Sequence, residues 1–160
     1  MLKADPMHLP ERTVVLAVLF SSYALVALCA GIINYPTRTS AEVVLILSVG
    51  LFVQLTLLYG ILRFKGAHQH FTKAVGSLLG TSALMTLILL PVNLILLKSE
   101  LEWLRAVADS LTWIWLAWWL LIGGNILAKV ARLSLAQGAI LIFVTELLST
   151  LASLHWVGEL

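Results

Sequence analysis

Charged residues and cysteines are both scarce in this sequence. Asp, Glu, Lys and Arg make up 11% of the 160 residues, whereas soluble domains carry about 25%. The single cysteine, Cys29, excludes a disulfide framework. Basic residues exceed acidic ones by only two, so the chain is not a nucleic-acid-binding protein with a strongly basic face.

Apolar residues are abundant instead, at 61% of the chain with a mean hydropathy of +1.02. They form five runs of about 20 residues or more, the length that crosses about 30 Å of hydrocarbon as a helix. The runs do not alternate as barrel strands do, and a backbone without water partners must bond within its own helix. The sequence therefore predicts an all-α polytopic membrane protein, one transmembrane domain over residues 1–160 forming a bundle of five transmembrane helices at about 13–33, 41–62, 73–97, 107–128 and 133–157.

The basic residues are distributed unevenly between the two ends of this predicted bundle. Seven of the ten lie in the N-terminal tail, the second-to-third loop or the fourth-to-fifth loop. Because Lys and Arg are retained on the cytoplasmic side, we expect a cytoplasmic N-terminus and a periplasmic C-terminus. The composition favours a bacterial inner membrane. The second-to-third loop carries Arg63, Lys65 and Lys73, a basic stretch that is able to contact anionic lipid headgroups.

The predicted loops are too short to form a soluble domain. The longest, residues 63–72, has about ten residues, and the last connection, 129–132, has about four. So short a link predicts that the fourth and fifth spans form an antiparallel hairpin. Any activity is expected between the helices or on the short cytoplasmic surfaces.

Glu146 lies near the middle of the fifth predicted span. Inserting a charged side chain at the centre of a bilayer costs roughly 3 kcal/mol on insertion scales. Glu146 is therefore a candidate functional residue. Ser149, Thr150 and Ser153 follow at spacings that place them on the same side of a helix, and Gln137 is a further polar candidate. Two interpretations remain open: a proton or ion relay or partner contact, and a protonated carboxyl that bonds to a neighbouring helix.

The third predicted span contains Pro91 and Asn93. A proline removes one internal hydrogen bond and usually kinks the helix, and a broken helix beside a polar group is a way in which transporters build binding sites. A purely structural kink is the alternative. The polar Gln54, in the second span, is expected to bond between helices.

Small residues mark two surfaces for close helix packing. Gly76 and Gly80 are four residues apart in the third span, and Gly123 and Gly124 are adjacent in the fourth. Such residues let helix backbones approach closely in membranes.

Six tryptophans are concentrated toward the C-terminal half. The predicted topology brings Trp103, Trp113 and Trp156 near the non-cytoplasmic interface, which indole rings prefer. Trp118 and Trp119 lie deeper and are expected to pack against protein or lipid.

Histidines, catalytic motifs and metal-ligand patterns provide no candidate chemistry. His8, His68, His70 and His155 lie outside or at the ends of the predicted spans, whereas haem ligation needs histidines inside a bundle. A pair such as His68 and His70 is too few for a metal site. We therefore expect no enzyme activity, cofactor or metal.

Several segments resemble the Yip (Ypt-interacting protein) family, in particular its small bacterial members. They are the helix end GILRFKG at 60–66, the basic entry FTKAV at 71–75, the apolar run ending at Pro91, the segment IWLAWWL at 114–120, and the start of the last helix, LSLAQGA, at 133–139. The resemblance covers about residues 41–155. It implies five spans and a cytoplasmic N-terminus, and it implies no catalytic residues. Eukaryotic members resemble membrane adaptors for small GTPases, but only about a dozen residues precede the first span here.

Two functions are expected from these observations. The first is a small integral membrane adaptor or accessory subunit that acts through helix packing and its short cytoplasmic loops. The alternative is a transporter or proton-linked component that uses Glu146 and the Pro91–Asn93 region, and five spans would then require an oligomer. The expected partners are the lipid bilayer and another membrane protein or a second copy, not nucleic acid.

Overall fold

The computed structural model describes residues 13–157, and the described part of the chain is helical without strands. Five of its helices are long and apolar enough to cross a membrane, which confirms the predicted all-α bundle. Lys3 and Arg12, used in the orientation argument, and His8 lie outside the described residues. The helices are α1 (Thr13–Asn34), α2 (Ser40–Phe64), α3 (Phe71–Lys98), α4 (Glu102–Ala131) and α5 (Leu135–Val157), with a short 3-10 turn, η2 (His68–His70), before α3.

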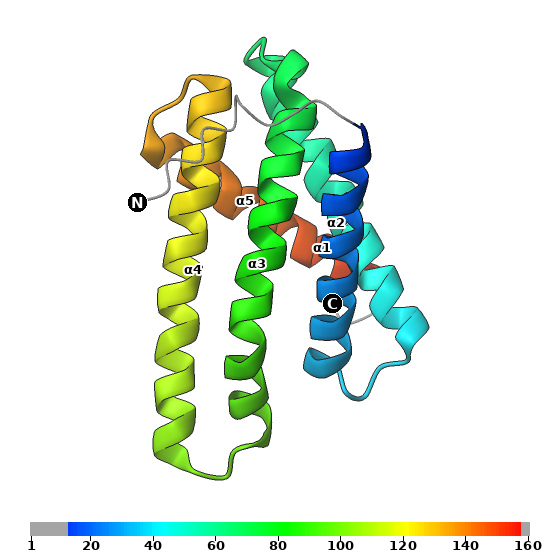
Figure 1. Cartoon of the computed structure of the whole chain (residues 1–160), viewed down its shortest axis with the longest axis vertical. Helices are drawn as coiled ribbons and strands as arrows, with labels where there is room; N and C mark the ends of the chain where they lie inside the picture. Colours follow the sequence, from blue (N-terminus) through cyan, green and yellow to red (C-terminus); the bar gives the residue numbers. More distant parts are fainter. Residues whose placement is uncertain (1–12, 158–160) are drawn as a thin grey trace.

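The helices pack in two series, and α4 belongs to both. In one series α4 packs on α3, and α3 packs on α1. In the other, α4 packs on α5, and α5 packs on α2. Figure 1 shows α4, α3 and α1 side by side, with α5 crossing behind them from the end of α4 to α2. Residues distant in sequence on α1, α2, α4 and α5 can therefore meet near the centre.

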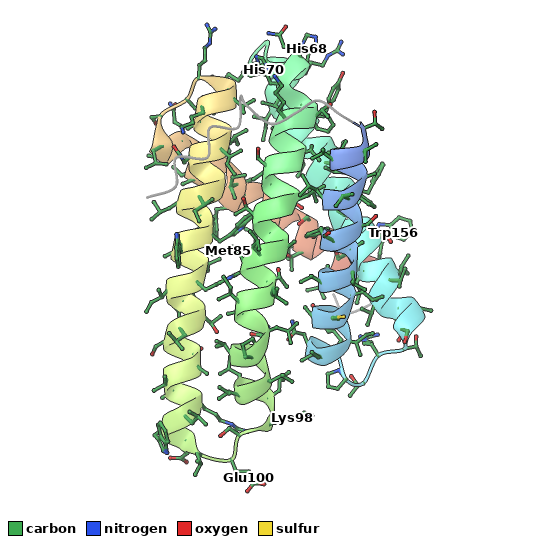
Figure 2. All side chains as sticks on the ribbon, viewed as in Figure 1. His68, His70, Met85, Lys98, Glu100 and Trp156 are labelled. Carbon is green, nitrogen blue, oxygen red and sulfur yellow. The ribbon has the colours of Figure 1, made fainter. Side chains whose placement is uncertain are left out.

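The helices α4 and α5 pack against each other, as the predicted hairpin requires, but at an oblique angle. After the short turn that follows α4, α5 runs obliquely across the bundle and reaches α2 (Figure 1). Trp156, near its end, consequently does not lie at the end of the bundle that holds Lys98 and Glu100 (Figure 2), so this placement does not fit the predicted interfacial position. A short link keeps two helix ends close without fixing the angle between the helices.

Close backbone contacts explain how α5 packs on its neighbours. A Cβ atom added to Gly124 would lie 2.6 Å from the backbone nitrogen of Ala139, and one added to Gly138 would overlap the carbonyl oxygen of Gly124. The α4 and α5 backbones therefore touch where both lack side chains. On α3, Gly76 and Gly80 instead accommodate the side chains of α1.

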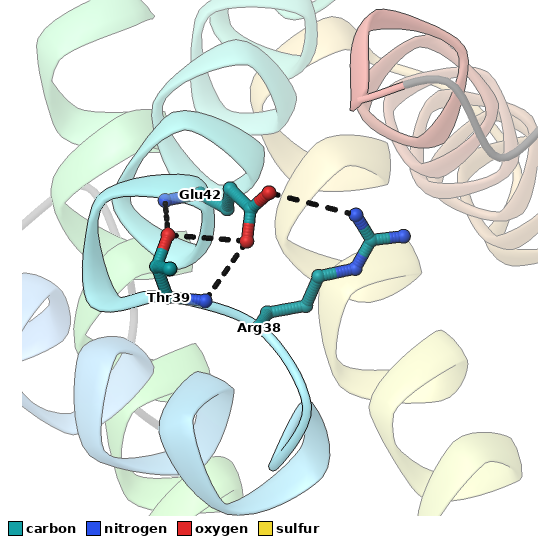
Figure 3. Close-up of polar contacts among 3 residues, drawn as sticks. All are labelled: Arg38, Thr39 and Glu42. Atoms are coloured by element: carbon teal, nitrogen blue, oxygen red, sulfur yellow. Dashed lines mark hydrogen bonds and ion pairs between the residues drawn. The ribbon is translucent and has the colours of Figure 1, made fainter.

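Local sequence signals fix the starts of two helices. Before α2, the Thr39 hydroxyl accepts from the backbone N–H of Glu42 at 3.3 Å, and the Thr39 N–H donates to the Glu42 carboxylate at 2.8 Å. Figure 3 shows this capping box with Arg38 beside it, its Nη1 3.8 Å from Glu42 Oε1. A similar reciprocal pair, Ser134 and Gln137, begins α5.

The helix α4 is longer than its predicted span of 107–128. It begins at Glu102 and ends at Ala131, where Arg132 takes the left-handed conformation with φ 53° and stops the helix. Hydropathy marks the part of a helix suited to lipid, and the helix itself continues through charged residues on both sides. The acidic Glu102 in the first turn is compatible with the positive end of the helix dipole.

Large apolar side chains occur on both the inside and the outside of the bundle. Leu62, Leu127, Ile142 and Val43 are the largest fully buried side chains. Many others are exposed on the outer faces, and examples from four helices are Val14, Phe52, Leu84 and Trp118. Outer surfaces of this kind suit a lipid bilayer as solvent.

The two ends of the bundle carry different charge. The end with the α2–α3 and α4–α5 connections holds exposed Arg63, Lys65, Lys129 and Arg132, and His68 and His70 lie there too (Figure 2). Among residues 13–157, the acidic side chains other than Glu146 all belong to the start of α2, the α3–α4 connection or the first turns of α4. The end with the α2–α3 and α4–α5 connections is therefore cationic, and the opposite end has mixed charge.

Candidate functional site

Glu146 is near the middle of α5 and is joined to another helix by a short hydrogen bond. The side-chain Nε2 of Gln54 on α2 donates to Oε1 of Glu146 at 2.6 Å. Both side chains are half-buried. The predicted role of Gln54 as a bond between helices agrees with this contact, and its partner is the intramembrane carboxyl.

Two aromatic side chains complete the surroundings of this carboxyl. Trp119 on α4, which is only 4% exposed, lies beside the Glu146 side chain. Tyr23 on α1 lines the same cavity as the carboxyl. All four residues lie near the midpoints of their helices. Four of the five long helices thus bring a polar group to the centre of the bundle.

A cavity of about 190 Å³ extends from Glu146 toward one end of the bundle. Its lining runs along α2 from Gln54 back to Ile46, and along α5 from Glu146 forward to Leu154. Tyr35, in the α1–α2 connection, belongs to the lining as well. At about 30 Å³ per molecule, the volume suits about six waters. The carboxyl therefore has a polar path toward the α1–α2 connection.

Ser149 and Ser153 form the polar side of this cavity on α5, as their spacing from Glu146 predicts. They are 6% and 4% exposed, respectively. The Ser149 hydroxyl donates to the carbonyl of Glu146 at 3.0 Å, and the Ser153 hydroxyl donates to the carbonyl of Ser149 at 2.7 Å. Gly50 of α2 lies opposite, where a Cβ atom would be 2.7 Å from the Ser153 hydroxyl oxygen. Each serine hydroxyl therefore donates its hydrogen to a backbone carbonyl of α5 itself.

Aliphatic side chains close the bundle on the opposite side of Glu146. Leu58 and Leu62 of α2 belong to one apolar cluster with Leu127 of α4 and Ile142 of α5. Each of these four is 3% exposed or less. Between the carboxyl and the cationic end, the bundle is therefore tightly packed and apolar.

The remaining predicted candidates lie away from this cavity. Gln137 is exposed at the start of α5, where its side chain accepts from the backbone N–H of Ser134 at 3.1 Å. Pro91 and Asn93 are on α3, which continues through the proline to Lys98 and does not line the cavity. The structure thus brings Gln54 and Glu146 together and leaves Gln137, Pro91 and Asn93 apart from them.

Sequence reasoning missed the aromatic part of the site. The sequence predicts only that Trp119 packs against protein or lipid, and it does not distinguish Tyr23, Tyr35 or Gly50 from their neighbours. The only signal for Tyr23 and Trp119 is their mid-helix position, which puts them at the depth of Glu146. Recognising them requires knowing that α1, α4 and α5 are neighbours at that depth.

The described residues offer no metal centre. No group of three or more His, Cys, Asp or Glu side chains among residues 13–157 could hold a metal ion. His68 and His70 are at the cationic end (Figure 2), whereas Glu146 is near the middle of α5. The chemistry available in the cavity is that of one carboxyl with amide, hydroxyl, phenol and indole groups.

No family model, curated protein or solved structure matches this chain. The resemblance to the Yip family therefore stays a prediction.

Proposed function

We propose that this protein is a proton- or cation-linked membrane transport component in which Glu146 is the ion-binding group. The observation that carries the proposal is the 2.6 Å bond between Gln54 and Glu146 at the head of a polar cavity in the middle of the bundle. Ionisable side chains inside membrane spans commonly mark ion or proton paths. The Pro91–Asn93 region, far from the cavity, is not part of the proposed site.

The unequal sides of Glu146 support access from one end. The hydroxyl-lined cavity reaches toward the α1–α2 connection, whereas Leu58, Leu62 and Leu127 fill the other side. Among the described residues, Tyr23 and Tyr35 are the other titratable groups that line the cavity. A proton or small cation would enter through the cavity, and its release at the other end would require the aliphatic cluster to open.

Proton flux into proteoliposomes tests this function. Glu146→Gln is expected to abolish a flux that the wild type supports, while leaving the helical content unchanged. Glu102→Gln is the matched control, because Glu102 is an exposed carboxyl at the start of α4. If Glu146→Leu is at least as stable as wild type and equally active, the carboxyl is a packing device and the proposal fails.

Thiol labelling tests the one-sided access independently. In a Cys29→Ser background, which removes the only cysteine, Ser153→Cys is expected to react with a membrane-impermeant thiol reagent added from the α1–α2 side. Leu58→Cys, in the aliphatic cluster, is the control and should stay unreacted. Equal labelling of both positions would contradict the one-sided path.

A second candidate function is a membrane adaptor or accessory subunit, as the resemblance to the Yip family implies. The observation that favours it is the cationic end, with exposed Arg63, Lys65, Lys129 and Arg132. We propose that this end faces the cytoplasm of a bacterial inner membrane, with the C-terminus periplasmic. It would contact anionic headgroups or an acidic membrane partner, or a second copy of the chain would complete the assembly.

Crosslinking in membranes tests the adaptor function. A specific partner should be lost in the double variant Arg63→Glu/Lys65→Glu and kept in Lys98→Glu, which changes the opposite end. A protein that stays alone and monodisperse in both variants and in wild type would count against the adaptor.

A further inference from the structure

The cavity beside Glu146 has the chemistry of a cation site. Its lining contains one carboxyl, two tyrosines, three hydroxyl residues and one amide, and no Lys, Arg or His among the described residues. A carboxyl without a cationic partner in a low-dielectric setting either takes up a proton or binds a positively charged ligand.

The hydroxyl groups on α5 make the cavity rich in hydrogen-bond acceptors. Ser149 and Ser153 donate their hydrogens to backbone carbonyls of α5, at 3.0 Å and 2.7 Å. A hydroxyl has one hydrogen and two lone pairs, so both oxygens remain able to accept. These groups cannot donate to a ligand without giving up a helix bond, and a ligand that brings its own N–H donors suits them.

The carboxyl itself retains acceptor capacity. An ionised carboxylate accepts about four hydrogen bonds, and Gln54 accounts for one. This donor holds the carboxyl in place from α2. The remaining capacity can serve a ligand in the cavity.

Two aromatic rings favour an organic ammonium over an alkali ion. Tyr23 and Tyr35 both line the cavity, and tyrosine rings attract ammonium groups through cation–π interactions. A volume of about 190 Å³ also exceeds what a bare alkali ion needs. The acceptors, the carboxylate and the rings together fit a small cation that has both N–H groups and a short apolar part.

We infer that the cavity between α1, α2 and α5 binds a small primary ammonium ion, held by Glu146 and by the hydroxyl oxygens of Ser149 and Ser153. This inference rests on the proposed function in using Glu146 as the ion-binding group. It adds the class of ligand and the residues that select it.

Isothermal titration calorimetry on the purified full chain in nanodiscs tests the inference, with methylammonium chloride as the probe at neutral pH. Potassium chloride and tetramethylammonium chloride at the same ionic strength are the comparison arms. Methylammonium should bind at least about tenfold more tightly than either, because potassium gains little from the rings and tetramethylammonium has no N–H to donate. Equal or tighter binding of either comparison ion would overturn the inference, as would no binding of methylammonium.

Variants assign the binding to the cavity. Glu146→Gln should weaken methylammonium binding at least about tenfold, and Ser149→Ala/Ser153→Ala should weaken it about three- to tenfold. Ser110→Ala is the matched control, because its hydroxyl also donates to its own helix, at 2.9 Å to Ala106, but lies on α4 outside the cavity. Should Glu146→Gln fail to fold, the serine variant decides: wild-type affinity in it would contradict the site.

The flux and binding experiments can reject the proposed function and the ammonium site independently of each other. Proton flux that depends on Glu146 without methylammonium binding would keep the proposed function and reject the ammonium site. Methylammonium binding in the cavity without any flux would keep the site and reject the transport function.

Discussion

The two sides of Glu146 are built from different residues on the same helices. Toward the cationic end, α2 and α5 contribute Leu58, Leu62 and Ile142 to a dry cluster. Toward the α1–α2 connection, the same helices contribute Gly50, Ser149 and Ser153 to a cavity. The comparison teaches that the cavity follows from side-chain size and polarity along two helices, since both helices continue regularly through both regions.

The largest expected difference between the two sides concerns their glycines. Gly138→Ala should lower the free energy of unfolding in detergent by about 3 kcal/mol, because its Cβ would meet the backbone carbonyl of Gly124, which cannot rotate away. Gly50→Ala should cost less than about 1 kcal/mol, because the one atom too close to its Cβ would be the Ser153 hydroxyl oxygen at 2.7 Å, which side-chain rotation can move, while the Ser149 carbonyl oxygen at 3.8 Å is an ordinary contact. Denaturant unfolding followed by circular dichroism measures both.

Gly60→Ala is the control for this pair, since a Cβ there meets nothing within 4 Å. Equal losses of unfolding free energy in Gly138→Ala and Gly50→Ala would show that the two sides of Glu146 are equally tightly packed. That result would contradict the proposed difference between them.

Truncation of leucines should reveal the same contrast at a smaller scale. Leu127→Ala removes a fully buried side chain from the dry cluster and should cost about 2 kcal/mol, the low end of the range for Leu→Ala, because lipid-facing neighbours can relax. Leu47→Ala borders a cavity that already exists, so it should cost about 1 kcal/mol. Thermal unfolding in the same detergent distinguishes the two, and a larger loss for Leu47→Ala would contradict the assignment.

The hydrogen bond at the boundary should contribute less than either packing change. A double-mutant cycle with Gln54→Leu and Glu146→Leu is expected to give a coupling energy of about 0.6 kcal/mol, the average for side-chain bonds between membrane helices. The unfolding free energies of the four proteins yield this value. A coupling energy indistinguishable from zero would mean that the 2.6 Å contact does not contribute to stability.

The smallest effect is expected from the cavity serines. Ser149→Ala and Ser153→Ala should each change the free energy of unfolding by less than about 0.5 kcal/mol, because a serine that bonds back to its own helix adds little stability. Ser110→Ala provides the reference value for such a bond outside the cavity. A loss above about 1 kcal/mol at either cavity serine would make these hydroxyls structural.

Much of the fold and part of the site follow from the sequence. The five apolar runs predict the five helices, because a bilayer leaves the backbone no alternative. The spacing of Ser149 and Ser153 after Glu146 predicts their common side, because helix periodicity is a local property. The sequence also predicts that Gln54 bonds between helices, because it is a polar side chain within an apolar span.

The parts that sequence reasoning missed depend on contacts between helices. The oblique course of α5 depends on the meeting of Gly124 and Gly138, and neither glycine indicates its partner. Trp119 and Tyr23 join the site because of that course. Gln137 has a local explanation that could have been found: Ser134 three residues before it is the spacing of a capping box.

The length of α4 has a consequence for how the molecule sits in its membrane. Its 30 residues span about 45 Å at 1.5 Å per residue, whereas the hydrocarbon layer is about 30 Å thick. Together with α3, it reaches beyond α1 and α2 at one end (Figure 1). The surplus turns begin with Glu102 and also hold Arg105 and Asp109, so they suit the headgroup layer. This polar extension would thus accommodate thinning or thickening of the bilayer, and the Glu146 carboxyl would keep its depth.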